Sequence, residues 1–488
     1  MKTKHYFWGV LTLCAGLSLT ACDDDDNGVG GVKQLADDEP AAAVQSTGFY
    51  LVNEDWFGHD NGSVNFFKQT AADSYEGVYR AYRAANGENE TLGVTTQYGT
   101  VWGGNVYFIS KQGNRLVVAD AETLKKKAVL TDIQGDGRSF VGVDEKKGYI
   151  ALSDGIVVFD IESMAVGNKI EGVSGQIGNM ALSGNRVFAV SQQNGLYVIN
   201  AETDAVEKNI SGTFNTLTVS KDGKVWVAGS EGFECIDPLT LESRKVAYPE
   251  GTAIGNSWGA WNAGGLCAST QENVLYWTAG GSMFGGGKLV VKYDIDKAAA
   301  AVIYELGKSD NGVQLEFYGA GLRVDPLTDH LILTAKHEGW GGAYAWNWLF
   351  KLTNAGKEVT HFLLQGDNGT GEAWSGGAED WNGKYFWFPA MPMFQDANKP
   401  QLLLNQVWLK PGETAEVNLA EKVVDYDNAP AAMRYFLQTG DAALAEVSLQ
   451  GSVLKVQASE QTGTTKCRIG VLSNGVRVEK DIEIAVMP

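Results

Sequence analysis

The chain has 488 residues, with 39 Lys and Arg against 59 Asp and Glu, and its formal net charge is −20 at pH 7. A chain this acidic is repelled by a phosphate backbone, so its composition argues against nucleic acid as a partner. Its length is sufficient for two domains with a large core.

The N-terminal residues have the pattern of a secretion signal. A short basic head precedes an apolar run from Tyr6 to about Leu19, which is too short to span a bilayer. The four residues that end at Cys22 resemble a bacterial lipobox, and an acidic run follows at 23–26. The resemblance implies a signal peptide over 1–21, a lipid on Cys22 and display on the exterior of the outer membrane. The alternative is an ordinary cleaved signal followed by an unrelated cysteine.

The segment after Cys22 is predicted to be a tether. Residues 22–46 are acidic, rich in Gly and Ala, and lack strong periodicity, which is typical of a flexible linker. No later apolar run approaches the length of a membrane span, so the lipid is the only predicted membrane attachment.

From Gly48 onward a pattern recurs about every 40 residues. An acidic or amide residue closes a β-rich run and a turn follows, first at Asp120, Asp160 and Asn200 and then at Asp237 and Asp294. Repeats of this length, made of short strands, are typical of four-stranded propeller blades. An unrelated all-β sandwich is the alternative.

Seven units can be recognised, each divisible into strands A to D. In the clearest unit, 216–247, Asp222 and Gly223 supply the tight turn between strands A and B. The first unit lacks an obvious strand A, and the stretch 381–388 is expected to supply it and close the ring. The predicted B strands lie near Phe49, Val106, Tyr149, Val187, Val225, Leu275 and Leu331.

The character of the chain changes near Lys399. Residues 401–488 contain short alternating runs such as Ser452–Val456, which suggest a small sandwich resembling bacterial immunoglobulin-like modules. The predicted fold is therefore all-β, with a seven-bladed β-propeller over 47–397 followed by an Ig-like β-sandwich over 398–488.

One face of this propeller is predicted to bind a ligand. In every blade, the B-to-C loops and the loops into strand A lie on the same face, and here they are rich in Gly, aromatic residues, amides and cations. Such loops suit a broad, partly apolar ligand. The alternative is that the tryptophans only wedge between blades. The candidate ligand-binding residues are Trp56, His59, Lys111, Arg115, Arg138, Phe214, Trp258, Tyr318, Trp340 and Trp374.

Catalytic and metal motifs are weak. No His-x-x-x-His or Glu-x-x-His spacing occurs, and the widely spaced Cys235, Cys267 and Cys467 are expected to be small buried apolar side chains. The sequence therefore predicts no catalytic residue, no metal and no cofactor. Carboxylates that share the candidate face offer at most a weak acid-and-base pair; they are Glu54, Asp55, Asp136, Glu316, Glu338 and Glu372.

Several local motifs resemble a known family. The runs 48–54, 111–114, 317–321 and 387–390 resemble Bacteroidota surface lipoproteins whose seven-bladed propellers are related to YncE-like, or YVTN-repeat, propellers. Some relatives capture vitamin B12 and pass it to a TonB-dependent transporter. The resemblance covers about 48–397, and the added C-terminal module departs from the simplest members.

Three functions follow as hypotheses. The first is a non-enzymatic surface lipoprotein that captures a nutrient, with a corrinoid as the best single guess and a TonB-dependent transporter as its partner. The second is a carbohydrate-binding or carbohydrate-active accessory protein, suggested by the tryptophans. The third is a scaffold whose propeller binds another protein.

Overall fold

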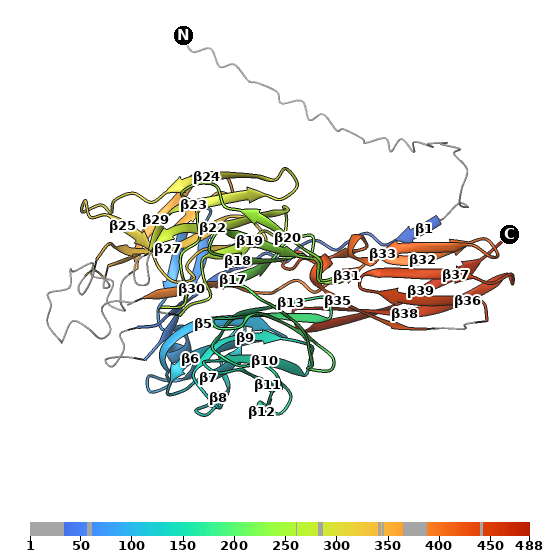
Figure 1. Cartoon of the computed structure of the whole chain (residues 1–488), viewed down its shortest axis with the longest axis horizontal. Helices are drawn as coiled ribbons and strands as arrows, with labels where there is room; N and C mark the ends of the chain where they lie inside the picture. The colour runs from blue at the N-terminus through green and yellow to red at the C-terminus, as the bar shows by residue number, and fades with distance from the viewer. Residues whose placement is uncertain are drawn as a thin grey trace, which may run out of the picture.

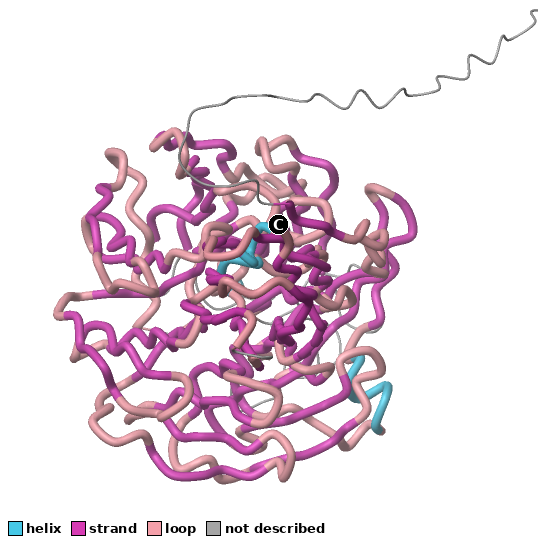
Figure 2. The backbone as a smooth tube through the Cα atoms, turned by 90° about the vertical axis from the view of Figure 1, so that its right-hand side faces the viewer, coloured by secondary structure: helices cyan, strands magenta, loops and turns pink. Residues whose placement is uncertain are grey.

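The computed structural model describes residues 34–55, 61–259, 261–281, 286–339, 343, 346–364, 388–439 and 443–488. Their β-sheets form two bodies, a propeller and a sandwich stacked against one of its faces (Figure 1). Seen from the sandwich side, the blades surround the centre of the propeller (Figure 2). No helix among these residues is long and apolar enough to cross a membrane.

The first blade is closed by a strand from the far end of the propeller sequence. Its order is β30 (Pro389–Phe394), β2 (Gly48–Asn53), β3 (Ser63–Ala71) and β4 (Ser74–Val78), and α1 (Ala81–Asn86) follows β4. A late strand therefore supplies strand A, as predicted. The predicted position was wrong, because β30 begins just after the stretch 381–388, of which 381–387 lie outside the described residues.

The other described blades contain consecutive strands, from A at the centre to D at the rim. Blades 2 and 3 consist of β5 (Val94–Trp102), β6 (Asn105–Gln112), β7 (Leu116–Asp120) and β8 (Lys126–Leu130), then β9 (Gly137–Gly142), β10 (Lys147–Leu152), β11 (Ile156–Asp160) and β12 (Ala165–Lys169). Blades 4 and 5 consist of β13 (Ile177–Ser183), β14 (Arg186–Ser191), β15 (Gly195–Asn200) and β16 (Val206–Ile210), then β17 (Phe214–Val219), β18 (Val225–Gly229), β19 (Gly232–Ile236) and β20 (Ser243–Ala247).

Blades 6 and 7 complete the ring. Blade 6 contains β21 (Leu266–Ala268), β22 (Val274–Gly281), β23 (Gly286–Asp294) and β24 (Ala299–Glu305). In blade 7 the inner strand is interrupted, so β25 (Leu315–Phe317) and β26 (Arg323–Val324) both pair with β27 (Leu331–His337), which β28 (Asn347–Leu352) and β29 (Glu358–Leu364) follow. The described sheets thus form the seven blades predicted, and each predicted B strand is present.

Burial explains why the B strands were recognisable. In β6, the side chains from Asn105 to Ser110 are all buried, because neighbouring blades cover both faces of the sheet. A strand covered on both faces appears in the sequence as a short continuous apolar run. The outer strand β16 is largely exposed, so its sequence carries a weaker signal.

The sandwich has its own core. One sheet has the order β1 (Gln34–Asp37), β32 (Leu404–Leu409), β39 (Val476–Val486), β38 (Gly463–Ser473) and β35 (Arg434–Gln438). The other has the order β33 (Thr414–Asn418), β37 (Val453–Ala458) and β36 (Ala445–Gln450), and a short pair joins β31 (Gln401–Leu402) to β34 (Val423–Val424). Two 3₁₀ turns, η3 (Leu419–Glu421) and η4 (Pro430–Ala432), complete this body, and Leu404, Ile469 and Ile482 are buried between its sheets.

The tether predicted over 22–46 is wrong for its second half. β1 pairs antiparallel with β32 at the edge of the sandwich (Figure 1). The Ala41 N–H donates to Gln401 Oε1 at 2.7 Å. Lys422 and Lys480 bind the carboxylates of Asp37 and Asp38. Backbone groups make the strand pairing, and they cover an edge that would otherwise be open.

The sandwich covers one face of the propeller, here called the turn face because it carries the A-to-B turns. The N–H of Gly103, in blade 2, donates to the Asn474 carbonyl at 2.8 Å, and the N–H of Gly184, in blade 4, donates to the Ala432 carbonyl at 2.9 Å. Arg434 Nη1 reaches the Val143 carbonyl of blade 3 at 3.0 Å. The opposite face, here called the loop face, carries the B-to-C loops and the loops into strand A.

Candidate functional site

Charged side chains from different blades meet on the loop face. Glu54, which follows β2 of blade 1, is buried, and the Tyr318 hydroxyl of blade 7 donates to its Oε1 at 2.7 Å. Burial raises the pKa of Glu54, whereas the positive charge of Lys111 and the Tyr318 hydrogen bond lower it. Burial also lowers the pKa of Lys111, which the Glu54 charge raises. The charges of Glu54 and Lys111 therefore favour each other across blades 1 and 2.

Two arginines extend this cluster around the ring. Arg115 Nη1 donates to Asp136 Oδ1 at 2.6 Å and to the Lys111 carbonyl at 2.9 Å, so it joins blades 2 and 3. Arg138, at the start of the inner strand β9, is 8 % exposed, and its Nη2 donates to Gln176 Oε1 at 3.3 Å. Burial lowers the pKa of Arg138, and the Asp136 charge raises it.

Two buried polar atoms in this region have no hydrogen-bond partner among the described residues. They are Arg138 Nε and Gln97 Oε1, and Gln97 lies on the inner strand β5 of blade 2. Buried polar groups are normally hydrogen-bonded, so such atoms mark a place where a further partner can be accepted. We call Glu54, Gln97, Lys111, Arg138 and Tyr318 the loop-face cluster.

Trp258 is packed in the core between blades 4 and 5. Its side chain is 8 % exposed, and its Nε1 donates to the Phe214 carbonyl at 2.7 Å. A Cβ atom at Gly178 would lie 2.9 Å from the Trp258 ring and 3.1 Å from Trp261 Nε1. The glycine of blade 4 thus makes room for both rings. We therefore assign Trp258 to internal packing and not to the ligand surface on which the sequence placed it.

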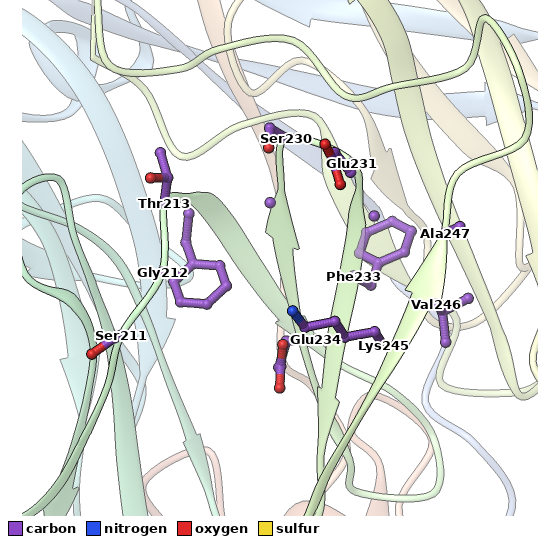
Figure 3. Close-up of a pocket in the computed structure, with 13 residues that line it drawn as sticks. Ser211, Gly212, Thr213, Ser230, Glu231, Phe233, Glu234, Lys245, Val246 and Ala247 are labelled. Carbon is purple, nitrogen blue, oxygen red and sulfur yellow. The ribbon is translucent and has the colours of Figure 1, made fainter.

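Phe214 lines a shallow pocket in blade 5. The pocket has a volume of about 290 Å³ and lies beside the loops that precede β17 and join β18 to β19. In Figure 3, Ser230 and Glu231 lie at the loop end, while Glu234 and Lys245 lie further along the strands. Phe214 and Phe233 supply apolar surface. The glycines at 212, 229 and 232 add no side chain to the pocket wall.

The carboxylates that suggested an acid-and-base pair have other partners. Asp136 pairs with Arg115, Glu316 forms a buried ion pair with Lys336, and Glu338 binds Lys288 at 3.1 Å. No group of three or more His, Cys, Asp or Glu among the described residues is arranged to hold a metal ion. The prediction that the cysteines are buried is confirmed for Cys235, Cys267 and Cys467.

The predicted site residues have three outcomes. Lys111, Arg115, Arg138 and Tyr318 come together, whereas Phe214 lines the blade 5 pocket and Trp258 is packed in the core. Sequence reasoning missed Gln97 and gave Glu54 only a weak catalytic role. A polar residue within an inner strand was the available signal for Gln97. Trp56, His59, Trp340, Trp374 and Cys22 lie outside the described residues.

Residues 47–395 match the family described as Domain of unknown function (DUF5074). The chain belongs to this family. A search of the curated proteins finds no match.

Two solved structures from one species are similar to this chain. A quinonprotein alcohol dehydrogenase-like protein from Bacteroides thetaiotaomicron is 15 % identical, with 72 % of this chain and 78 % of that chain covered and a TM-score of 0.52. The extracellular domain of a hybrid two component system from the same species is 14 % identical, with 93 % and 57 % covered and a TM-score of 0.42. At 15 % identity, the similarity to the first of these structures shows the fold alone.

Proposed function

We propose that this member of the family is a non-enzymatic surface lipoprotein that captures a nutrient on the loop face. The observation that carries the proposal is the loop-face cluster, in which ionisable groups are buried on the face that the sandwich leaves open. Burying charged groups is costly, and binding sites are where such an arrangement is maintained.

The mixed charges of the cluster favour a large, overall polar ligand over a simple ion. The side chains of Lys111 and Arg138 can donate hydrogen bonds to a ligand, and those of Glu54 and Gln97 can accept them. An amide substituent needs one donor and one acceptor, and a corrinoid carries a ring of such amides. Cobalamin is therefore the best single candidate, with transfer to a TonB-dependent transporter as the next step.

A glycan is the second candidate, supported by the blade 5 pocket. Phe214 and Phe233 can pack against the apolar face of a sugar, and Glu231, Glu234 and Lys245 can bind its hydroxyls. A carbohydrate-binding accessory role would use this pocket and leave the loop-face cluster empty.

The attachment of β1 to the sandwich supports capture from outside. With a lipid on Cys22, residues 23–33 would reach at most about 40 Å, at roughly 3.5 Å per residue. Because β1 lies on the sandwich, that body would be nearest the membrane and the loop face would point away. Replacing Cys22 with Ala should abolish membrane attachment. Replacing 23–26 with Ala should keep the lipid but protect the protein from protease added to intact cells.

Calorimetric titration of the full chain with cyanocobalamin, haem and a glycan panel tests the ligand. We expect cyanocobalamin to bind saturably and the Lys111→Met change to weaken it about tenfold or more. The matched control Lys245→Met, in blade 5, should leave cobalamin binding unchanged. The opposite pattern, with glycan binding lost in Lys245→Met, would establish the second candidate. Absence of cobalamin binding would contradict the first.

A further inference from the structure

A second cavity lies at the other end of the propeller axis, between the inner strands and the sandwich. Its volume is about 460 Å³, and strands from six blades line it together with Asp396, Asp427, Asn428 and Asn474. A further space of about 290 Å³ adjoins it and shares Tyr98, Asn428 and Asn474. Cavities of this size are typical of small-molecule sites.

Arg323 is the cation of this cavity. It lies on β26 in blade 7, and its Nη1 donates to the Gly264 carbonyl at 3.2 Å and the Leu322 carbonyl at 2.6 Å. No carboxylate of the described residues forms an ion pair with it, and its Nε and Nη2 make no hydrogen bond to them. A guanidinium stays charged at neutral pH, so a fork-shaped donor lines the cavity without an ion-pair partner among the described residues.

The remaining polar groups of the wall offer acceptors. Asp396 accepts hydrogen bonds from Nδ2 of Asn428, at 3.2 Å, and from Nδ2 of Asn474. Asn179 likewise uses its Nδ2, which donates to the Leu217 carbonyl at 3.0 Å. The amide oxygens of Asn179, Asn428 and Asn474 therefore have no hydrogen-bond partner among the described residues. Amide oxygens accept hydrogen bonds from hydroxyl groups.

Apolar side chains complete the lining. Leu217, Met391 and Met393 border the cavity between the polar groups. A ring with an apolar face can pack against such side chains, and the flexible methionines adapt to its shape.

We propose that this cavity binds a small hydroxylated carboxylate, a sugar acid by class. The carboxylate pairs with the guanidinium of Arg323, and the hydroxyls donate to the amide oxygens of Asn179, Asn428 and Asn474. Neither the loop-face cluster nor the blade 5 pocket takes part, so this site is independent of the function proposed above.

The sandwich is hydrogen-bonded to some blades of the turn face and not to others. The hydrogen bonds from the sandwich to the A-to-B turns go to blades 2, 3 and 4, whereas no described hydrogen bond links it to the turns at Thr270 or Pro326. Both of these residues border the cavity. We expect a small solute to enter beside the sandwich on this side.

Calorimetric titration of the full chain with sodium D-glucuronate tests this site, with D-glucose and sodium acetate as matched probes. We expect saturable binding of D-glucuronate alone. Arg323→Met should weaken that binding about 30-fold or more, because the carboxylate loses its charged partner. The control Arg115→Met, on the loop face, should not change it. Cobalamin binding should in turn be unaffected by Arg323→Met, which separates failure here from failure of the loop-face proposal.

A second variant distinguishes lost binding from misfolding of the Arg323→Met protein. Thr218 borders the cavity from blade 5, so Thr218→Phe narrows the space while leaving the guanidinium in place. It should also abolish D-glucuronate binding with an unchanged melting temperature. Absence of saturable D-glucuronate binding by the full chain would overturn the proposal. Equal affinity for acetate, or unaltered binding in both variants, would do the same.

Discussion

The two faces of the propeller differ in what holds their groups in place. On the turn face, backbone groups of Gly103 and Gly184 bind the sandwich directly, and Arg434 reaches the neighbouring turn of blade 3. On the loop face, side chains of different blades bind one another, as Tyr318 binds Glu54. The turn face is thus an internal joint, whereas the ionisable groups of the loop face lie on the side that the sandwich leaves uncovered.

This difference indicates where a change should act. A substitution at the joint or in the core should lower the free energy of unfolding, because the side chain that it removes already has hydrogen-bond or packing partners inside the protein. A substitution in the loop-face cluster should alter binding more than stability. The predictions below, in order of decreasing effect, test that division.

The largest effect is expected for Trp258→Ala. The ring fills the space above Gly178 and donates to the Phe214 carbonyl. Its removal should lower the free energy of unfolding by about 3–5 kcal/mol, the usual cost of an aromatic cavity. Urea denaturation followed by tryptophan fluorescence measures it. Unchanged stability together with lost ligand binding would show that Trp258 contacts the ligand and that its assignment to internal packing is wrong.

Arg434→Ala should come next, because it breaks the joint itself. Arg434 is 3 % exposed, and its Nε donates to Asn185 Oδ1 at 2.9 Å in addition to the bond with Val143. Loss of these bonds should cost about 2–3 kcal/mol. The control is Arg468→Ala, an exposed partner of Asp481, whose removal should cost less than about 1 kcal/mol. Equal effects in the two variants would show that the joint contributes little.

The joint should also weaken as the pH rises. Burial, together with the charges of Asp425 and Asp427, raises the pKa of Asp396 to about 7. The unfolded carboxyl has its ordinary pKa of 3.8, so the folded chain binds more protons between pH 4 and 7. Stability is therefore greatest at low pH in this window and declines towards pH 7.

Asp396→Asn removes that titration. Wild type should lose on the order of 2 kcal/mol more than this variant between pH 5 and pH 8, measured by urea denaturation at both values. Asp481→Asn is the control, since its exposed carboxyl has a pKa lowered by Arg468 and shows no such decline in this range. If Asp396→Asn and wild type lose the same stability, the carboxyl is not responsible.

The sequence predicted the parts of the fold that depend on local burial. The B strands were recognisable as apolar runs, such as that around Val106, because two neighbouring blades bury them. β1 was not recognisable, because four residues at a sheet edge bind through their backbone. The sequence placed the closing strand too early. Apolar residues precede β30 as well, and only the pairing with β2 determines which of these residues form the strand.

The sequence likewise predicted only part of the candidate site. Blade topology put Lys111, Arg115 and Arg138 on one face, and their contacts agree with that placement. The burial of Trp258 was not predictable, because it depends on the glycine at 178, in another blade. The cavity at Arg323 was not predictable either, since the sandwich that forms its floor meets the propeller only in three dimensions.

The smallest effect is expected for Arg115→Ala, at the edge of the loop-face cluster. Its ion pair with Asp136 is short, but the two side chains are 26 % and 46 % exposed, so water screens the attraction. The free energy of unfolding should fall by less than about 1 kcal/mol. Around a neutral ligand, affinity should change only modestly and remain nearly insensitive to salt, because no net charge meets the guanidinium. Titration at low and high ionic strength measures both quantities. A steep dependence on salt, lost in the variant, would mean that Arg115 steers an anionic ligand or a protein partner to the loop face, and the neutral-nutrient proposal would then be wrong.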